Sequence, residues 1–285
     1  MSATAARQKL LADGVVFPES PRWHTDRLWF SDVYDFALKT VDLQGQARVV
    51  TRVPGRPSGL GALPDGRMLM ATALERVLYA VSDDGTMEAV ADLSLRATGL
   101  LNDMVVDRQG RAYVGDTGFN VAAGEPFKPG CTWLVAPGRE PEVAADDVHL
   151  HNGCAISPDG RMLYVAETFA HRISRFDIDD DGRLSNRQIH AELSSRPDGL
   201  CLDHEDHLWV AMVQDSEFVR VDPSGVIVDR LESPESFALA CVLGGPDRAQ
   251  LFLCSADTSM ERLRDGDSRG SIDVLEVPVH GAGLP

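Results

Sequence analysis

Five polar residues of this chain lie at nearly the same distance before a strand-like phrase. Each precedes an aromatic or apolar anchor by 10 to 12 positions, and the five are Glu19, Ser58, Asn102, Asn152 and Asp198. If the phrases occupy equivalent elements around one axis, these side chains meet in a narrow space. Two carboxylates and two amides there would leave buried charge unpaired unless a cation lay between them. An all-oxygen set suits a hard ion, so the pattern predicts one divalent cation, with calcium favoured and magnesium, manganese or zinc as alternatives.

The elements that must position these residues form a repeat. Each copy has a turn rich in Asp and Gly followed by an apolar strand; the copies are HTDRLWFSD from His24, PDGRMLMAT from Pro64, DRQGRAYVGD from Asp107, PDGRMLYVAE from Pro158, DHEDHLWVA from Asp203 and PDRAQLFLCS from Pro246. Their anchor residues are 40 to 51 positions apart, a spacing typical of propeller blades. We therefore predict an all-β, six-bladed β-propeller with four-stranded blades, and a single domain over residues 1–285.

The ring needs a device that closes it. The last repeat contains only three strand-like segments and ends near Val279, whereas residues 7–13 offer a spare strand before the first blade. We expect this N-terminal strand to pair into the last blade, because pairing removes an exposed sheet edge.

Composition narrows the possible partners. The net charge is -17 and there is no run rich in Lys and Arg, which argues against nucleic acid as a partner. There is neither a signal-like apolar run near the start nor a stretch of about 18 apolar residues, so we expect a cytoplasmic protein without a membrane partner. The five cysteines form no CxxC pair and lie mostly in apolar segments, so we expect them to be reduced.

Four motifs in order resemble those of the SMP-30/gluconolactonase (regucalcin-like) family. Its EGPxW start appears as residues 19–23, its ND pair as Asn102 and Asp103, its NGxxxSPDG phrase as residues 152–160 and its PDG segment as residues 197–199. The resemblance covers nearly the whole chain. It implies that Glu19, Asn152 and Asp198 hold one divalent metal ion, and that Asn102 binds substrate or supplies a fourth ligand. It also implies hydrolysis of a lactone, with organophosphate hydrolysis as a relative's activity.

One departure from the family pattern bears on the substrate. Members that act on sugar lactones usually carry an Arg two residues before the ND pair, where this chain has Leu100. Two long insertions, residues 116–130 and 256–268, and their neighbours bring five apolar side chains toward the expected rim: Phe119, Phe127, Phe169, Phe218 and Met260. We therefore expect a lactone less hydrophilic than a sugar lactone, with Phe119 and Phe127 joining Asn102 and Asp103 in substrate binding.

The expected reaction is metal-assisted hydrolysis. Asp198 is the first candidate for the general base that activates water, and Asp103 is the second. No GxSxG elbow is present to support a covalent serine route. Two alternatives remain open at this point: an organophosphate hydrolase on the same metal site, and a propeller without enzymatic activity that binds calcium or a partner.

Two local patterns also have simpler readings. Asn152 followed by Gly153 could be only a hairpin turn. His149 and His151 have the spacing of a metal-binding pair, but they precede an inner strand, so we expect a structural or rim role for them.

Overall fold

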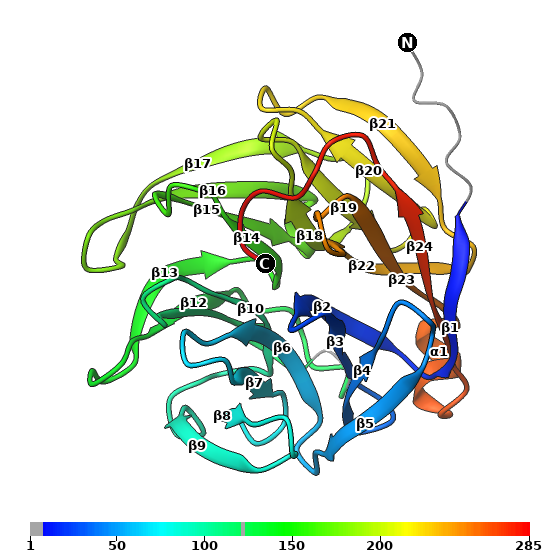
Figure 1. Cartoon of the computed structure of the whole chain (residues 1–285). Coiled ribbons are helices and arrows are strands. Elements are labelled where there is room, and N and C mark those ends of the chain that lie inside the picture. Colours follow the sequence, from blue (N-terminus) through cyan, green and yellow to red (C-terminus); the bar gives the residue numbers. More distant parts are fainter. Residues whose placement is uncertain (1–7, 121–122) are drawn as a thin grey trace.

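In a computed structural model that describes residues 8–120 and 123–285, the strands form six four-stranded sheets around a central axis (Figure 1). Neighbouring strands within each sheet pair antiparallel, and in five of the sheets they follow sequence order from the axis outward. The predicted six-bladed propeller with four-stranded blades is therefore confirmed.

The blades are numbered in chain order. From the axis outward, blade one consists of β2 (Pro18–His24), β3 (Arg27–Asp32), β4 (Ala37–Val41) and β5 (Ala47–Arg52); blade two of β6 (Pro57–Ala62), β7 (Met68–Thr72), β8 (Val77–Val81) and β9 (Met87–Asp92); and blade three of β10 (Leu101–Val106), β11 (Ala112–Asp116), β12 (Gly130–Val135) and β13 (Glu142–Val148). Blade four consists of β14 (His151–Ile156), β15 (Met162–Glu167), β16 (Arg172–Ile178) and β17 (Leu184–Glu192); blade five of β18 (Pro197–Leu202), β19 (Leu208–Met212), β20 (Glu217–Val221) and β21 (Ile227–Glu232); and blade six of β22 (Phe237–Gly244), β23 (Gln250–Asp257), β24 (Arg269–Glu276) and β1 (Lys9–Val15).

The N-terminal strand β1 closes the ring. It pairs antiparallel with β24, with Lys9 opposite Val274 and Val15 opposite Gly270, and becomes the outermost strand of blade six (Figure 1). The predicted closure is confirmed, and the strand occupies Lys9–Val15; of the predicted range 7–13, residue 7 lies outside the described residues. Pairing in this way covers the edge that β24 would otherwise expose.

The hydrophobic core lies between neighbouring blades. Where blade six meets blade one, for example, Phe252 packs with Phe30, and the Trp23 ring stacks on Phe252 with the ring centroids 5.4 Å apart. Trp29, Trp133 and Trp209 are also buried. The described cysteines, which include all five of the chain, are free thiols. Each sheet thus buries both faces against its neighbours, and the ring is stabilised as a unit.

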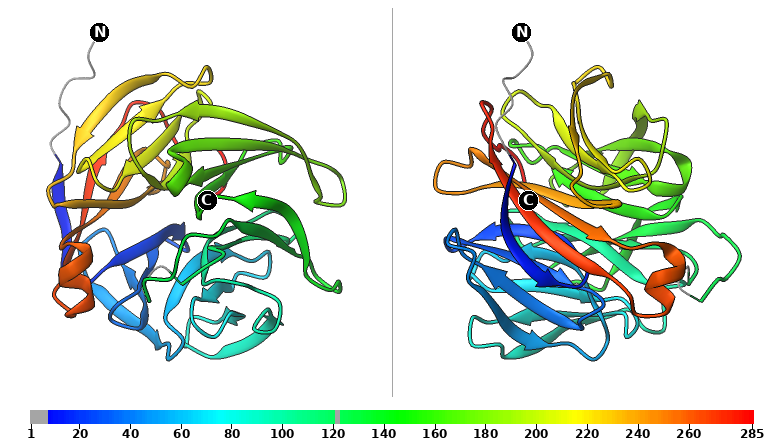
Figure 2. Two further views of the ribbon diagram at one scale, coloured as in Figure 1. Left: turned by 180° about the vertical axis from the view of Figure 1, so that it is seen from behind. Right: turned by 90° about the vertical axis from the view of Figure 1, so that its right-hand side faces the viewer.

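The connections at the two ends of the channel differ. A short α1 (Met260–Arg264) lies between β23 and β24, and a 3-10 helix η1 (Thr168–Ala170) follows β15. In the right-hand view of Figure 2, α1 and the loop between β11 and β12 project from the same face. The C-terminal tail crosses the opposite end of the channel, where Leu284 bridges to Ile156 and Gly281 to Asp203. Neither helix in the described part of the chain is long and apolar enough to cross a membrane.

Candidate metal and substrate site

The polar residues singled out from the sequence share one position in the fold. Each is the second residue of the innermost strand of its blade: Glu19 in β2, Ser58 in β6, Asn102 in β10, Asn152 in β14 and Asp198 in β18. In blade six the equivalent residue of β22 is Ala238, whose side chain contains no oxygen. The structure brings all five side chains to the lining of one cavity. Because Asn152 lies inside β14, the alternative of a simple hairpin turn at Asn152 and Gly153 is wrong.

Close approach of the inner strands depends on glycine. Immediately after the shared position, the inner strands interrupt their regular pairing with a bulge. A Cβ atom on Gly153 would lie only 2.5 Å from the carbonyl oxygen of Asp198 in the next blade. Since only glycine fits this gap, it lets β14 and β18 bring Asn152 and Asp198 close together.

The amide of Asn152 is held by its neighbour Thr168. Asn152 Nδ2 donates to Thr168 Oγ1 at 3.1 Å, and Thr168 Oγ1 donates to the carbonyl oxygen of Pro197 at 2.8 Å. The second asparagine, Asn102, donates from Nδ2 to the carbonyl oxygen of His151 at 2.9 Å. Both amide oxygens are thereby left available to a ligand.

These side chains line a cavity of about 250 Å³. Its polar lining includes Glu19, Ser58, Asn102, Asp103, Asn152 and Asp198. Its apolar walls include Leu100, Leu101, Leu150, Phe169, Val213, Phe237, Met260 and Leu263. A largely apolar pocket with a few convergent polar groups is the usual form of a small-molecule site.

The electrostatics of the cavity floor favour a cation. Burial raises the pKa of Glu19 well above its usual range, and the charges of Asp198 and Asp103 raise it further. Burial likewise raises the pKa of Asp198, the charge of Asp103 adds to this, and a hydrogen bond from Asn152 offsets only part of it. Oδ1 of Asp198 is buried with no hydrogen-bond partner among the described residues. Buried carboxylates of this kind raise the free energy of the folded protein, and a positive charge between them lowers it.

The third carboxylate, Asp103, already has a cationic partner. Its Oδ1 accepts three hydrogen bonds: from Ser20 Oγ at 2.7 Å, from Arg22 Nη2 at 2.8 Å and from the backbone N–H of Met104 at 2.8 Å. Its Oδ2 accepts no hydrogen bond from the described residues. Asp103 thus lines the cavity but carries a balanced charge, which makes it a weaker candidate than Asp198 for a proton acceptor.

The candidate ligand set therefore consists of two carboxylates and an amide. Among residues 8–120 and 123–285, no group of three or more His, Cys, Asp or Glu side chains is arranged to hold a metal ion. That is compatible with the oxygen set at the floor, because Asn152 supplies one donor and Asp103 is paired with Arg22. The donor chemistry of Glu19, Asn152 and Asp198 fits a hard divalent ion.

The two histidines next to this set lie apart from the cavity lining. His151 is fully buried, and its Nδ1 lies 2.8 Å from Thr132 Oγ1. Burial lowers the pKa of His151 to about 4. His149 lies near the surface, with Nε2 3.4 Å from Asp147 Oδ1. The arrangement supports the structural and rim roles expected for this pair.

The predicted aromatic rim is built differently from the expectation. Phe169 and Met260 line the cavity, whereas Phe119 is 2% exposed and Phe127 is 45% exposed, and neither is part of the lining. Both rings pack against Phe169, with centroid distances of 5.7 Å and 5.8 Å. Direct substrate contact by Phe119 and Phe127 therefore stays a prediction, and their observed contacts support the Phe169 wall. Phe218 was wrongly expected at the rim, because it is fully buried in the core.

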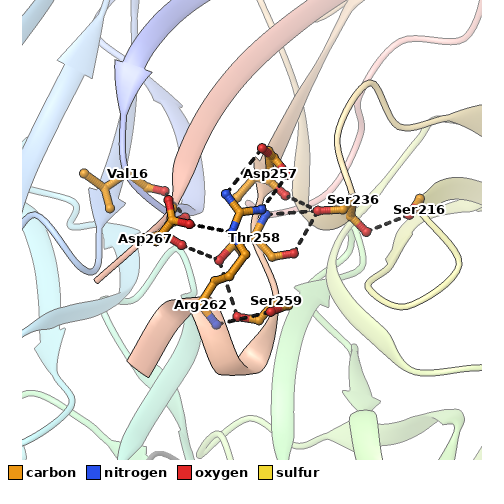
Figure 3. Close-up of polar contacts among 10 residues, drawn as sticks. Val16, Ser216, Ser236, Asp257, Thr258, Ser259, Arg262 and Asp267 are labelled. Carbon is orange, nitrogen blue, oxygen red and sulfur yellow. Dashed lines mark hydrogen bonds and ion pairs between the residues drawn. The ribbon is translucent and has the colours of Figure 1, made fainter. Parts of the chain in front are cut away.

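The second insertion forms a fixed wall around α1. Arg262 of the helix donates to Asp257 Oδ1 at 2.8 Å and to Asp267 Oδ2 at 2.7 Å, and so joins the two ends of the insertion (Figure 3). Ser259 caps the helix by accepting from the Arg262 N–H. Ser236 of blade six donates to the Thr258 carbonyl oxygen at 2.9 Å (Figure 3). These contacts hold Met260 and Leu263 against the cavity.

Two lining residues were missed by the sequence analysis. Arg56 and Arg196 both line the cavity, one residue before inner strands β6 and β18. A signal was present, because RPSGL from Arg56 and RPDGL from Arg196 are nearly the same phrase.

Fold and site together define a propeller whose inner strands gather carboxylates and amides at the floor of an apolar axial cavity. A family model described as SMP-30/Gluconolactonase/LRE-like region matches residues 17–257. The chain therefore belongs to this family, and the resemblance seen in the motifs is confirmed.

Individual relatives are distant but cover nearly the whole chain. A 6-deoxy-6-sulfogluconolactonase of Pseudomonas putida is 26% identical over 280 residues, which are 95% of this chain and 94% of that protein. The regucalcin of Bos taurus is 30% identical over 269 residues, which are 90% of this chain and 87% of that protein. A solved structure of a calcium-binding protein, regucalcin, from Agrobacterium tumefaciens superposes with a TM-score of 0.85 and 21% identity, covering 100% of this chain and 98% of that one. This last likeness shows the shared fold.

Proposed function

We propose that this protein is a lactonase that depends on one divalent cation. The observation that carries the proposal is the pair of carboxylates, Glu19 and Asp198, at the floor of an apolar cavity, where burial and the charges of neighbouring carboxylates raise their pKa values. Membership of the SMP-30/gluconolactonase family and the lactonase name of the Pseudomonas relative support the reaction class.

The cation would be held by Glu19, Asn152 and Asp198. Calcium is favoured because the donors are all oxygens; magnesium, manganese and zinc are the other candidates. When bound, a divalent ion polarises the lactone carbonyl and stabilises the negative charge that develops on its oxygen.

The residues of the chain would transfer the proton and bind the substrate. Asp198 accepts a proton from the water whose oxygen bonds to the carbonyl carbon, and its raised pKa suits a group that must take up and release a proton. As the ring carbon–oxygen bond breaks, the same proton passes to the leaving alkoxide, giving a hydroxy acid. Asn102 and Asp103 line the same cavity and would hydrogen-bond the substrate.

The walls favour a lactone less hydrophilic than a sugar lactone. Leu100, which stands where the family's sugar-lactone members usually carry an Arg, lines the cavity together with Leu150 and Val213. Such side chains leave sugar hydroxyls without hydrogen-bond partners, and that desolvation is unfavourable.

A substrate panel with single metal ions tests the proposal. Protein stripped with a chelator would be resupplied with calcium, magnesium, manganese or zinc and assayed on aliphatic, sugar and aromatic lactones and on a phosphotriester. We expect turnover of the apolar lactones only after an ion is restored, with calcium most effective. Asp198→Ala should abolish this turnover. Glu140→Gln is the control: the Glu140 side chain is 97% exposed, and its replacement should leave turnover unchanged.

Three outcomes would contradict the proposal. Full activity in metal-stripped protein would show that the reaction needs no cation. Substantial activity in Asp198→Ala would show that Asp198 is not the essential base. Turnover of the phosphotriester without any lactone would replace the reaction with organophosphate hydrolysis at the same site.

A further inference from the structure

The cavity contains two cationic side chains that the lactonase reaction does not use. Arg56 and Arg196 line it together with the candidate metal ligands. Within residues 8–120 and 123–285, neither guanidinium forms an ion pair or donates a side-chain hydrogen bond, and the buried Nε of Arg56 has no acceptor. Most other arginines are paired, as Arg22 is with Asp103 and Arg262 with Asp257. Unpaired guanidinium groups beside a cavity are available to an anion.

The two arginines occupy equivalent places in the propeller. Each is followed by Pro, then by the residue at the shared inner position, then by Gly and Leu, in the phrases that begin at Arg56 and Arg196. The corresponding strands β6 and β18 belong to the second and fifth blades, which face each other across a six-membered ring (Figure 1). The repeat therefore presents two guanidinium groups from opposite sides of the channel.

Aromatic rings lie close to both guanidinium groups. Arg56 Cζ lies 4.7 Å from the centroid of the Tyr34 ring and 5.7 Å from that of Phe36. Arg196 Cζ lies 4.9 Å from the centroid of the Phe169 ring. A cation–π contact restrains a guanidinium and leaves N–H groups that can donate hydrogen bonds to an oxyanion.

Neither arginine is paired with a carboxylate of the cavity floor. Among the described residues no ion pair joins Arg56 or Arg196 to Glu19, Asp103 or Asp198, and Asp103 is instead paired with Arg22. The charges of the two arginines therefore remain available to an anionic ligand.

We propose that the natural lactone carries an oxyanion substituent, a carboxylate, sulfonate or phosphate, which Arg56 and Arg196 bind while the apolar walls enclose its ring. The inference rests on the proposed lactonase function and adds the charge of the substrate to it. The substrate is then apolar at the ring and negative at one end, which fits both the leucine-rich wall and the paired arginines.

Matched lactones that differ only in charge provide the test. 2-Oxochroman-6-carboxylate and 2-oxochroman-6-sulfonate would be compared with the neutral 2-oxochroman-6-carboxamide by kcat/KM. We expect the wild type to favour the anionic lactones by about tenfold or more, mainly through KM. Arg56→Gln and Arg196→Gln should each reduce this preference by about tenfold, and the Lys variants should restore part of it.

The control is an arginine outside the cavity. Arg108→Gln removes the same charge from an exposed position after β10, and we expect it to leave the preference at the wild-type value. Equal kcat/KM for charged and neutral lactones in the wild type would overturn the inference. An equal loss of kcat/KM for charged and neutral lactones in the Gln variants would also overturn it.

A binding measurement separates this inference from the proposed reaction. The lactam 2-oxo-1,2,3,4-tetrahydroquinoline-6-carboxylate and its carboxamide resist hydrolysis and can be titrated calorimetrically into the calcium-loaded protein. One outcome would support the anion site and contradict the lactonase reaction: no lactone is hydrolysed, but the lactam carboxylate binds about tenfold more tightly than the carboxamide and loses this advantage in the Gln variants. Hydrolysis of lactones without a charge preference would support the reaction and contradict the anion site.

Discussion

Arg22 and Asp103 form a buried ion pair beneath the cavity, with Arg22 Nη2 2.8 Å from Asp103 Oδ1 and side chains only 5% and 8% exposed. Arg22 also donates to the carbonyl oxygens of Leu60 and Met104, at 2.8 Å and 2.6 Å, and so joins three blades. Because one carboxylate of the channel is balanced in this way, the negative charge that remains at the floor is that of Glu19 and Asp198. The pair therefore contributes to the stability of the ring and defines the charge of the candidate metal site.

Breaking this pair should be strongly destabilising. Arg22→Met leaves Asp103 buried without its cation, and we expect a loss of about 3–5 kcal/mol in the free energy of unfolding, measured by denaturant titration. In the double variant with Asp103→Asn, the loss should be smaller than the sum of the single losses by about 2 kcal/mol. Additive losses would show that the two side chains are not coupled.

Ser20 stands in a strained conformation that its hydroxyl compensates. Its φ is 48°, at the place where the family's EGPxW motif has glycine, and its hydroxyl donates to Asp103 Oδ1. Ser20→Ala loses the hydrogen bond and keeps the strain, whereas Ser20→Gly loses the hydrogen bond and relieves the strain. We expect the Ala variant to be the less stable of the two by about 1 kcal/mol in thermal or chemical unfolding. The reverse order would contradict this account of position 20.

Removing the charge of Asp198 should have opposite effects with and without a cation. In chelator-treated protein, Asp198→Asn removes a buried carboxylate whose Oδ1 has no hydrogen-bond partner among the residues that the structure describes, so the melting temperature of the variant should equal or exceed that of the wild type. Calcium at about a hundredfold excess over its Kd should stabilise the wild type by about 2.7 kcal/mol and leave the variant unchanged. Differential scanning calorimetry measures both. A calcium shift of wild-type size in the variant would exclude Asp198 as a ligand.

Glu167 should make stability depend on pH in the acid range. Burial would raise its pKa, but hydrogen bonds from Arg172, the His149 N–H, Ser174 and Arg187 outweigh burial and hold the pKa at about 2. A lowered pKa contributes stability that is fully present above the unfolded-state value of 4.5 and is lost as pH falls toward about 2. The Glu167→Gln variant should therefore lose about 3 kcal/mol at pH 7.

The pH dependence of this loss distinguishes charge from packing. Between pH 7 and pH 4 the difference between wild type and Glu167→Gln should shrink by about 1 kcal/mol, because the unfolded wild type begins to bind its proton. Glu88→Gln, which removes an exposed partner of Arg67, is the control and should show little effect at either pH. A loss independent of pH would assign the effect of Glu167→Gln to packing alone.

Local sequence patterns encode the propeller, its closure by the N-terminal strand and the shared position of Glu19, Asn102, Asn152 and Asp198. These features were accessible because turn residues and strand alternation act over a few neighbouring residues, and because each blade repeats them. Equivalent positions of the repeats converge because a closed ring is symmetric about its axis.

Which side chains from different blades meet depends on the packing of the folded ring. There Asp103 pairs with Arg22, Phe218 is buried in the core, Phe119 and Phe127 pack against Phe169, and Arg56 and Arg196 line one cavity. Such contacts join residues far apart in the chain, and they depend on how the strands approach and how each side chain turns. No local pattern encodes that geometry, because it arises only when the blades pack against one another.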